Sequence, residues 1–189
     1  MKNKFRKEIL EKRLTLPQEY IEQKSSKIIS NLMTLDCIQH SKCVMTYLDF
    51  RNEVSTDALV HHLFNQSKHV CCPITEKNSR ELIPVEIHSL ENDIHLGAYH
   101  IREPKDLTHT VPLDKIDVVI VPLVAASSDG YRLGYGGGYY DRFIRKLRPD
   151  AITIGLSYEM QLFDSIPTKE HDIRLDCIVT ENRIILNKK

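Results

Sequence analysis

Residues 132–141, RLGYGGGYYD, constrain this chain more than any other stretch of its sequence. Four of the seven glycines in the chain lie here within five positions: Gly134, Gly136, Gly137 and Gly138. Glycine loses the most backbone entropy on ordering, so such a run is unfavourable inside a helix or strand. Backbone without Cβ atoms can instead adopt positive φ and bring several N–H groups close to a ligand. The run therefore predicts a binding loop.

The flanking residues predict a strand before this loop and a helix after it. Residues 117–123, DVVIVPL, are β-branched and apolar, which is typical of a buried strand. The apolar residues after the loop recur at the spacing of one helical stripe: Tyr140, Phe143, Ile144 and Leu147. A glycine loop that opens into a helix can bind an anion. The cation Arg132 and the carboxylate Asp141 at its two ends favour a magnesium nucleotide.

Two common phosphate-binding motifs do not match the loop. A P-loop would end in Gly-Lys-Ser/Thr, but Tyr139 and Tyr140 follow Gly138. A dinucleotide fingerprint beginning at Gly134 would need glycine at position 139. The alternative to a phosphate loop is a mobile glycine hinge or lid.

The overall composition narrows the range of partners. The chain has 26 basic and 26 acidic residues, so its zero net charge indicates no general attraction to nucleic acid or to anionic membranes. Any basic site has to be a local cluster. We expect a cytoplasmic protein without a membrane partner, because no apolar run approaches the ~20 residues of a membrane span and the N-terminus lacks a signal-peptide core. The five cysteines show no CxxC spacing and favour small core residues over disulfides.

Residues 3–14 predict a helix with an unusual face. Its apolar side is formed by Phe5, Ile9, Leu10 and Leu14. At about 100° per residue, three cations project from the middle of the same face: Lys2, Arg6 and Arg13. One such cation would be explained by a long side chain that reaches water along the core. Three in line predict a shared anion instead.

The rest of the chain alternates between predicted strands and helices. Strands are expected at 42–48, 68–74, 82–87, 151–155, 177–180 and 183–186, and helices at 18–35 and from a cap at Ser55 or Thr56 to residue 66. Residues 158–163 predict a short helical turn, and residues 97–114 an irregular segment with Glu103 and Pro104 on a loop. This alternation predicts one α/β domain, residues 1–189, built as a three-layer α/β/α sandwich around a mainly parallel sheet.

Other catalytic patterns are weak. The nine histidines form no HExxH motif, which argues against zinc. Ser127 and Ser128 lack a nucleophile elbow and are expected to shape the loop before the glycines. Glu53, Asp141 and Asp172 lie near predicted strand ends, where α/β sheets bind ligands, and are the carboxylates expected to act on one. The alternative for each is a solvated charge or a cap.

The chain resembles the 5-formyltetrahydrofolate cyclo-ligase, or 5,10-methenyltetrahydrofolate synthetase, family from residue 2 to about residue 181. RLGYGGGYYD at 132–141 is the most specific part of the resemblance. The N-terminal pattern also matches, as does a late one: Lys2-x-x-x-Arg6 with Arg13, and His171-Asp172…Asp176…Thr180-Glu181. His100 departs from the glycine that the family often has there, which affects only the local loop.

The resemblance implies a three-layer fold and a reaction that needs ATP and Mg²⁺, in which 5-formyltetrahydrofolate is cyclised to 5,10-methenyltetrahydrofolate. Carried over by position, the ATP contacts are Lys2, Arg6, Arg132, Leu133, Gly134, Tyr135, Gly136, Gly137, Gly138, Tyr139 and Tyr140. Folate contacts are Leu48, Glu53, Tyr135, Gly136, Gly137, Gly138 and Tyr139; the metal-associated acids are Asp141 and Asp172. Arg6, Arg132 and Asp141 are the expected catalytic residues. The partners are the two substrates, and we expect a monomer or a weak dimer.

Two other functions stay open at this point. One is a nucleotide-binding regulator without catalysis, against which Glu53 and the tyrosine pair argue, because a sensor needs no pterin pocket. The other is a sugar-phosphate or CoA-group enzyme on a similar sheet. The absence of an obvious nucleophile argues mildly against that enzyme.

Overall fold

The computed structural model describes residues 2–97, 101–170 and 172–187, and a seven-stranded sheet forms its centre. The strand order is β12-β11-β9-β6-β1-β2-β3. Its strands are β1 (Cys43–Met45), β2 (His69–Glu76), β3 (Glu81–Ile87), β6 (Val118–Val121), β9 (Ile152–Leu156), β11 (Cys177–Val179) and β12 (Ile184–Leu186). The five inner strands are parallel, and the two edge strands β3 and β12 pair antiparallel. The predicted mainly parallel sheet is confirmed.

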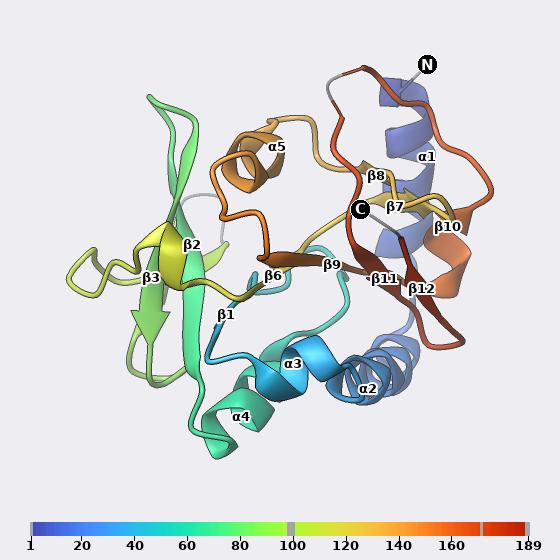
Figure 1. Cartoon of the computed structure of the whole chain (residues 1–189). Coiled ribbons are helices and arrows are strands. Elements are labelled where there is room, and N and C mark those ends of the chain that lie inside the picture. The colour runs from blue at the N-terminus through green and yellow to red at the C-terminus, as the bar shows by residue number, and fades with distance from the viewer. Residues whose placement is uncertain (1, 98–100, 171, 188–189) are drawn as a thin grey trace.

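Helices cover both faces of this sheet (Figure 1). One face carries α2 (Gln18–Met33), α3 (Asp36–His40) and α4 (Asp57–Asn65), and the other carries the short α5 (Tyr139–Ile144). In β6, Val118 and Ile120 pack with the first set of helices, whereas Val119 and Val121 pack with α5. A strand buried on both faces has no polar side, which explains the run of β-branched residues. The three-layer architecture follows from these two cores.

A second, three-stranded sheet was not predicted. It is formed by β7 (Ala125–Ser127), β8 (Arg132–Leu133) and β10 (Leu162–Phe163), in the order β10-β7-β8. Helix α1 (Lys2–Leu14) packs on it, with the ring of Phe5 edge-on to that of Phe163 at 5.1 Å. The prediction that Ser127 lies in a loop is therefore wrong, because this residue ends β7. The expected helical turn at 158–163 is a 3₁₀ turn, η3 (Glu159–Gln161), followed by β10.

The irregular segment 97–114 also contains more structure than expected. Strand β5 (Arg102–Pro104) pairs antiparallel with β4 (Ile94–Leu96), so the loop predicted at Glu103 and Pro104 is wrong. Pro104 is compatible with a strand here because an edge strand has no second neighbour that needs its missing N–H. A 3₁₀ turn, η2 (Leu113–Lys115), follows. The departure noted at His100 lies outside the described residues.

Several local predictions are settled by side-chain contacts. Thr56 precedes α4, but its hydroxyl donates to the carbonyl of Tyr47 and makes no cap; Asp49 accepts its N–H at 3.1 Å instead. Leu14 ends α1 and is 51% exposed, so it does not belong to the buried face. The adjacent cysteines 71 and 72 face opposite cores, as predicted, and all five cysteines are free. Within the described residues, none of the helices has the length and apolarity needed to cross a bilayer.

Candidate active site

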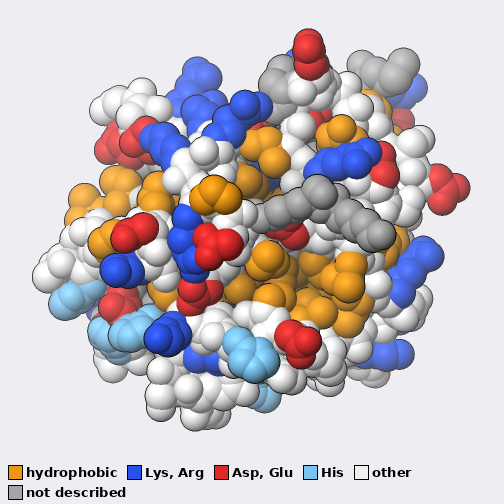
Figure 2. Space-filling view, in the orientation of Figure 1, with side chains coloured by type: hydrophobic (Ala, Val, Ile, Leu, Met, Phe, Trp, Pro, Cys, Tyr) orange, Lys and Arg blue, Asp and Glu red, His pale blue; other side chains and the backbone are white. Residues whose placement is uncertain are grey.

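A cleft of about 1610 Å³ opens where β1, β2 and β6 end. Its walls are the glycine loop, the segment that follows β1, the tip of the β2–β3 hairpin, β5 and the first turns of α1. Among the described residues that line it, ten are lysine or arginine and only five are aspartate or glutamate. Figure 2 shows many of these cations grouped between the hairpin tip and α5, at the top of the view. In a chain of zero net charge, this is the local basic cluster that an anionic ligand requires.

The glycine loop needs its glycines at two positions in particular. Gly136 has φ +103° and Gly138 has φ +67°, and L-residues rarely adopt this left-handed region. Gly138 precedes α5 directly, so the chain turns from the loop into the helix at this point. Because α5 has only six residues, its dipole is short, and the side-chain cations supply most of the positive field.

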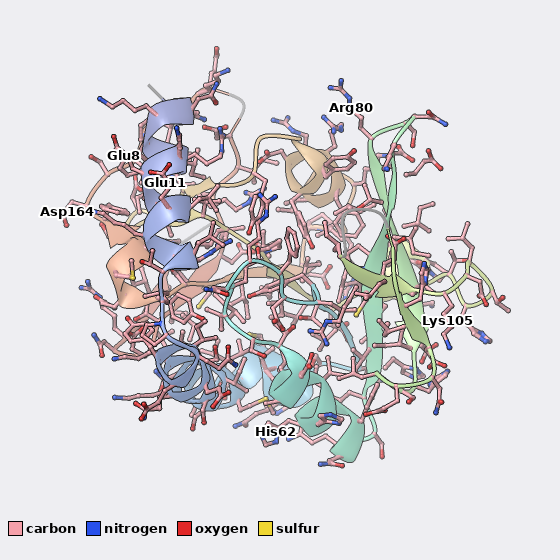
Figure 3. All side chains as sticks on the ribbon, turned by 180° about the vertical axis from the view of Figure 1, so that it is seen from behind. Glu8, Glu11, His62, Arg80, Lys105 and Asp164 are labelled. Atoms are coloured by element: carbon pink, nitrogen blue, oxygen red, sulfur yellow. The ribbon has the colours of Figure 1, made fainter. Side chains whose placement is uncertain are left out.

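The hairpin tip is tied to this loop. Arg142 on α5 donates to the carbonyl of Gly137 at 2.8 Å and to that of Arg80 at 3.1 Å. Lys146 pairs with Glu81 at the start of β3. Figure 3 shows Arg80 at the end of the hairpin, viewed from behind. The sequence did not predict that the hairpin forms a wall of the cleft, because a polar turn between two strands does not indicate which part of the fold the hairpin contacts.

Helix α1 brings Lys2 and Arg6 to the cleft, as its basic stripe predicted. Arg6 donates through Nε to the carbonyl of Gly134 at 2.7 Å, and Lys2 forms an ion pair with Asp172. The charged residues on the opposite side of the helix are exposed, and Figure 3 labels two of them, Glu8 and Glu11. The stripe thus reaches the glycine loop and the segment that carries Asp172.

Arg13, the third member of the stripe, is placed differently from the prediction. It is 1% exposed, and its guanidinium donates to the carbonyls of Arg51 and Leu123 and to the hydroxyl of Tyr135. It lies two turns of helix beyond Arg6 and, unlike Arg6, is not among the described residues that line the cleft. The prediction that all three cations share one anion is wrong for Arg13, because its donors are used by protein oxygens.

Glu53 is the buried acid of the site, with 6% of its surface exposed. Oε1 accepts a hydrogen bond from the Tyr135 hydroxyl at 2.6 Å, and Oε2 accepts the N–H of Phe50 at 2.9 Å. Burial raises the pKa of Glu53 to about 7, although the Arg13 charge and these two hydrogen bonds oppose the rise. A carboxyl group that titrates near neutral pH in a cleft is typical of a functional position.

The backbone that carries Glu53 is strained and firmly held. Arg51 and Asn52 have φ of +51° and +57°, which non-glycine residues adopt only when their surroundings enforce it. Hydroxyl groups of two buried tyrosines hold the residues that follow: Tyr158 donates to the carbonyl of Glu53 at 3.0 Å and Tyr47 to that of Val54 at 2.9 Å. Leu48, at the start of this segment, is buried and lines the cleft. Strain of this kind collects at binding sites.

Arg132 and Asp141 form a partly buried pair at the end of the glycine loop. Arg132 donates through Nη2 to Oδ1 of Asp141 at 2.9 Å and through Nη1 to the carbonyl of Ile173 at 3.1 Å. Burial lowers the pKa of Arg132, and the neighbouring Asp141 opposes this effect. The pair therefore links α5 to the segment that carries Asp172.

The chemistry of the donors bears on a metal ion. Within the described residues, no group of three His, Cys, Asp or Glu side chains is arranged as a metal cage. Mg²⁺ does not need one, since it is commonly held by one or two carboxylates together with substrate phosphates and waters. Asp141 and Asp172 both line the cleft and are anchored by the cations Arg132 and Lys2. They fit a metal that enters with a nucleotide.

Every residue predicted to bind ATP, folate or metal lines this one cleft. The set comes from α1, the segment after β1, residues 132–141 and the segment before β11, which are far apart in sequence. Their ligand roles stay predictions. His171, part of the late sequence pattern, lies outside the described residues.

Comparisons with known proteins agree on one family. The model of the 5-formyltetrahydrofolate cyclo-ligase family matches residues 1–181. The Escherichia coli K12 protein named 5-formyltetrahydrofolate cyclo-ligase is 30% identical over 93% of this chain and 98% of its own length. The NMR structure of Aquifex aeolicus 5,10-methenyltetrahydrofolate synthetase superimposes with a TM-score of 0.87 at 33% identity, covering 100% of this chain and 93% of that one. The synthetase from Mycoplasma pneumoniae gives 0.77 at 27% identity, covering 95% and 98%.

Proposed function

Because the chain belongs to the 5-formyltetrahydrofolate cyclo-ligase family, we propose that it cyclises 5-formyltetrahydrofolate to 5,10-methenyltetrahydrofolate with MgATP as co-substrate. One observation carries the proposal for this chain itself. The cleft combines a cationic glycine loop, suited to a triphosphate, with a buried carboxylate at Glu53, suited to the N–H donors of a pterin. A simple nucleotide sensor requires only the first of these.

The proposed reaction has two steps. The formyl oxygen attacks the γ-phosphorus of ATP, ADP departs, and the formyl carbon becomes activated as an imidate phosphate. N10 of the folate then attacks this carbon, inorganic phosphate departs with the former formyl oxygen, and N10 loses its proton as the ring closes. No protein nucleophile is needed, because N10 of the substrate forms the new C–N bond.

The protein contributes position and charge, which dominate catalysis of phosphoryl transfer. The glycine N–H groups with Arg6 and Lys2 bind phosphate oxygens, and Arg132 fixes the carboxylate at the end of the loop. Asp141 and Asp172 would hold Mg²⁺, which would supply charge neutralisation at the phosphates. Glu53 accepts hydrogen bonds from the pterin and so aligns the formyl group with the phosphate.

A direct assay tests this function. Purified protein is mixed with MgATP and 5-formyltetrahydrofolate, and the absorbance of the methenyl product is followed. We expect turnover that disappears when ATP is omitted or when EDTA removes the metal. Turnover that does not depend on ATP, or none from well-folded protein, would contradict the proposal. MgATP binding without turnover would support the regulator.

A further inference from the structure

Arg13 is one of the least exposed charged residues in the described chain, and every nitrogen of its guanidinium group donates to the walls of the site. Nε donates to the carbonyl of Arg51 at 2.9 Å, and Nη1 donates to that of Leu123 at 3.0 Å. Nη2 donates to the hydroxyl of Tyr135, whose ring centroid lies 5.6 Å from the guanidinium carbon. One side chain therefore holds the segment after β1, the segment after β6 and the glycine loop.

The contact to Tyr135 continues to Glu53. The hydroxyl of Tyr135 accepts from Arg13 and donates its own proton to Oε1 of Glu53 at 2.6 Å. The two hydrogen bonds form a relay from a cation through a phenol to a carboxylate. In this relay Nη2 of Arg13 donates to Tyr135, and Tyr135 donates to Glu53. Hydrogen bonds that end on charged groups are the strong ones, and a buried chain of them orients its members.

We propose that Arg13 is a positioning residue for the folate side of the site: acting through Tyr135, it holds the carboxyl group of Glu53 in place and favours its charged form for an incoming pterin. The inference rests on the proposed function as far as the ligand is concerned. The relay itself is a property of the protein without ligand.

Charge supports this interpretation, because the groups that act electrostatically on Glu53 include one cation, Arg13, and several acids. These groups are Asp49 from its own segment, which pairs with Arg102 of β5, Tyr47 from the segment after β1, Tyr135 from the glycine loop, Tyr140 from α5, and Arg13 from α1. Burial disfavours the carboxylate, and Arg13 is the largest influence that favours it. Without Arg13, Glu53 would be held by Tyr135 and the Phe50 N–H alone.

The test uses three variants and a control. Arg13→Gln removes the charge, Tyr135→Phe removes the hydroxyl that links the two ends, and Arg13→Lys keeps a charge without the planar fork. Lys12→Gln is the matched control, because it removes a cation from the neighbouring, exposed position of the same helix. Titration of Glu53 is followed in the apo protein by ¹³C NMR of the side-chain carboxyl, with the resonance assigned by its loss in Glu53→Gln.

We expect the titration midpoint of Glu53 to rise by about one pH unit or more in Arg13→Gln, to rise less in Tyr135→Phe, and to stay at the wild-type value in Lys12→Gln. Arg13→Lys should restore much of the midpoint but little of the folate affinity. In steady-state kinetics, KM for 5-formyltetrahydrofolate should rise about tenfold in Arg13→Gln, as for a loss of about 1.4 kcal/mol, while KM for ATP stays within about twofold.

A purely structural role for Arg13 predicts lower stability with an unchanged Glu53 midpoint, and equal losses for both substrates; either result would overturn the proposal. Tyr135→Phe keeps the test decisive if Arg13→Gln does not fold. The NMR titration needs no activity. A wild-type protein that shows the expected midpoints but no turnover would therefore refute the proposed function and leave the relay intact.

Discussion

The raised pKa of Glu53 predicts that this residue makes the free energy of unfolding depend on pH. In the unfolded chain the carboxyl group titrates near 4.5, and in the folded protein it titrates at about 7. Below pH 4.5 it is protonated in both states. Between these values the unfolded chain releases the proton while the folded protein retains it, so stability falls as pH rises. Above pH 7 both states are ionised and no further loss occurs.

The size of the effect follows from the two pKa values. One pKa unit corresponds to about 1.4 kcal/mol, so the difference between 4.5 and 7 gives up to about 3 kcal/mol. Glu53 is 6% exposed, so solvent screening takes little away from this amount. Glu53→Gln has the same shape but no charge at any pH. The variant should therefore gain about 3 kcal/mol relative to wild type between pH 4.5 and pH 8.

Urea unfolding of both proteins at half-unit steps from pH 4.5 to pH 8 measures this difference. All other titrating groups are common to the two proteins and cancel when the free energies of unfolding are subtracted. Only the pH dependence of this difference is diagnostic, not its pH-independent part. The substitution also changes a hydrogen bond, because the NH₂ group of glutamine has to face one of the two donors that Glu53 accepts from, the Tyr135 hydroxyl or the Phe50 N–H. A difference that stays level with pH, or that falls as pH rises, would refute the reasoning about burial.

Two further predictions concern the nucleotide side. Asp141→Asn should fold normally and lose most activity, and its dependence on Mg²⁺ should change more than its folate binding. Normal turnover with an unaltered Mg²⁺ titration would leave Asp141 only as the ion-pair partner of Arg132. Arg6→Ala should weaken MgATP binding by about 1.5–3 kcal/mol, seen as a smaller ATP-induced rise in melting temperature, whereas the exposed Lys4→Ala serves as the unaffected control. A lower melting temperature with the full ATP-induced rise would show that Arg6 only packs.

The features that the sequence predicted well are those with a direct steric or periodic cause. Positive φ at Gly136 and Gly138 follows from the absence of Cβ, and the burial of residues 118–121 follows from their β-branched, charge-free run. The helical stripe predicted that Lys2 and Arg6 share the packed side of α1 and meet an anion, since 100° per residue places both on that side, and both line the cleft.

The features that it missed depend on tertiary pairing. Strands β7, β8 and β10 have only two or three residues each, too few for any alternation to be recognised. Arg13 shares the stripe of Arg6, but periodicity predicts only the side of the helix from which a side chain projects. It does not predict which acceptor the side chain meets on that side. The backbone carbonyls of Arg51 and Leu123, which occupy its donors, come from segments 38 and 110 residues away.

The placement of Arg6 and Arg13 connects the two halves of the cleft. They are seven residues apart on α1, two turns of helix or roughly 10 Å, and therefore project from nearly the same side. Arg6 holds the carbonyl of Gly134, and Arg13 holds the hydroxyl of Tyr135. Consecutive residues of the glycine loop are thus fixed to one rigid helix. Because Arg13 also reaches the segment that carries Glu53, a displacement of α1 cannot open the phosphate side while leaving the acid side in place.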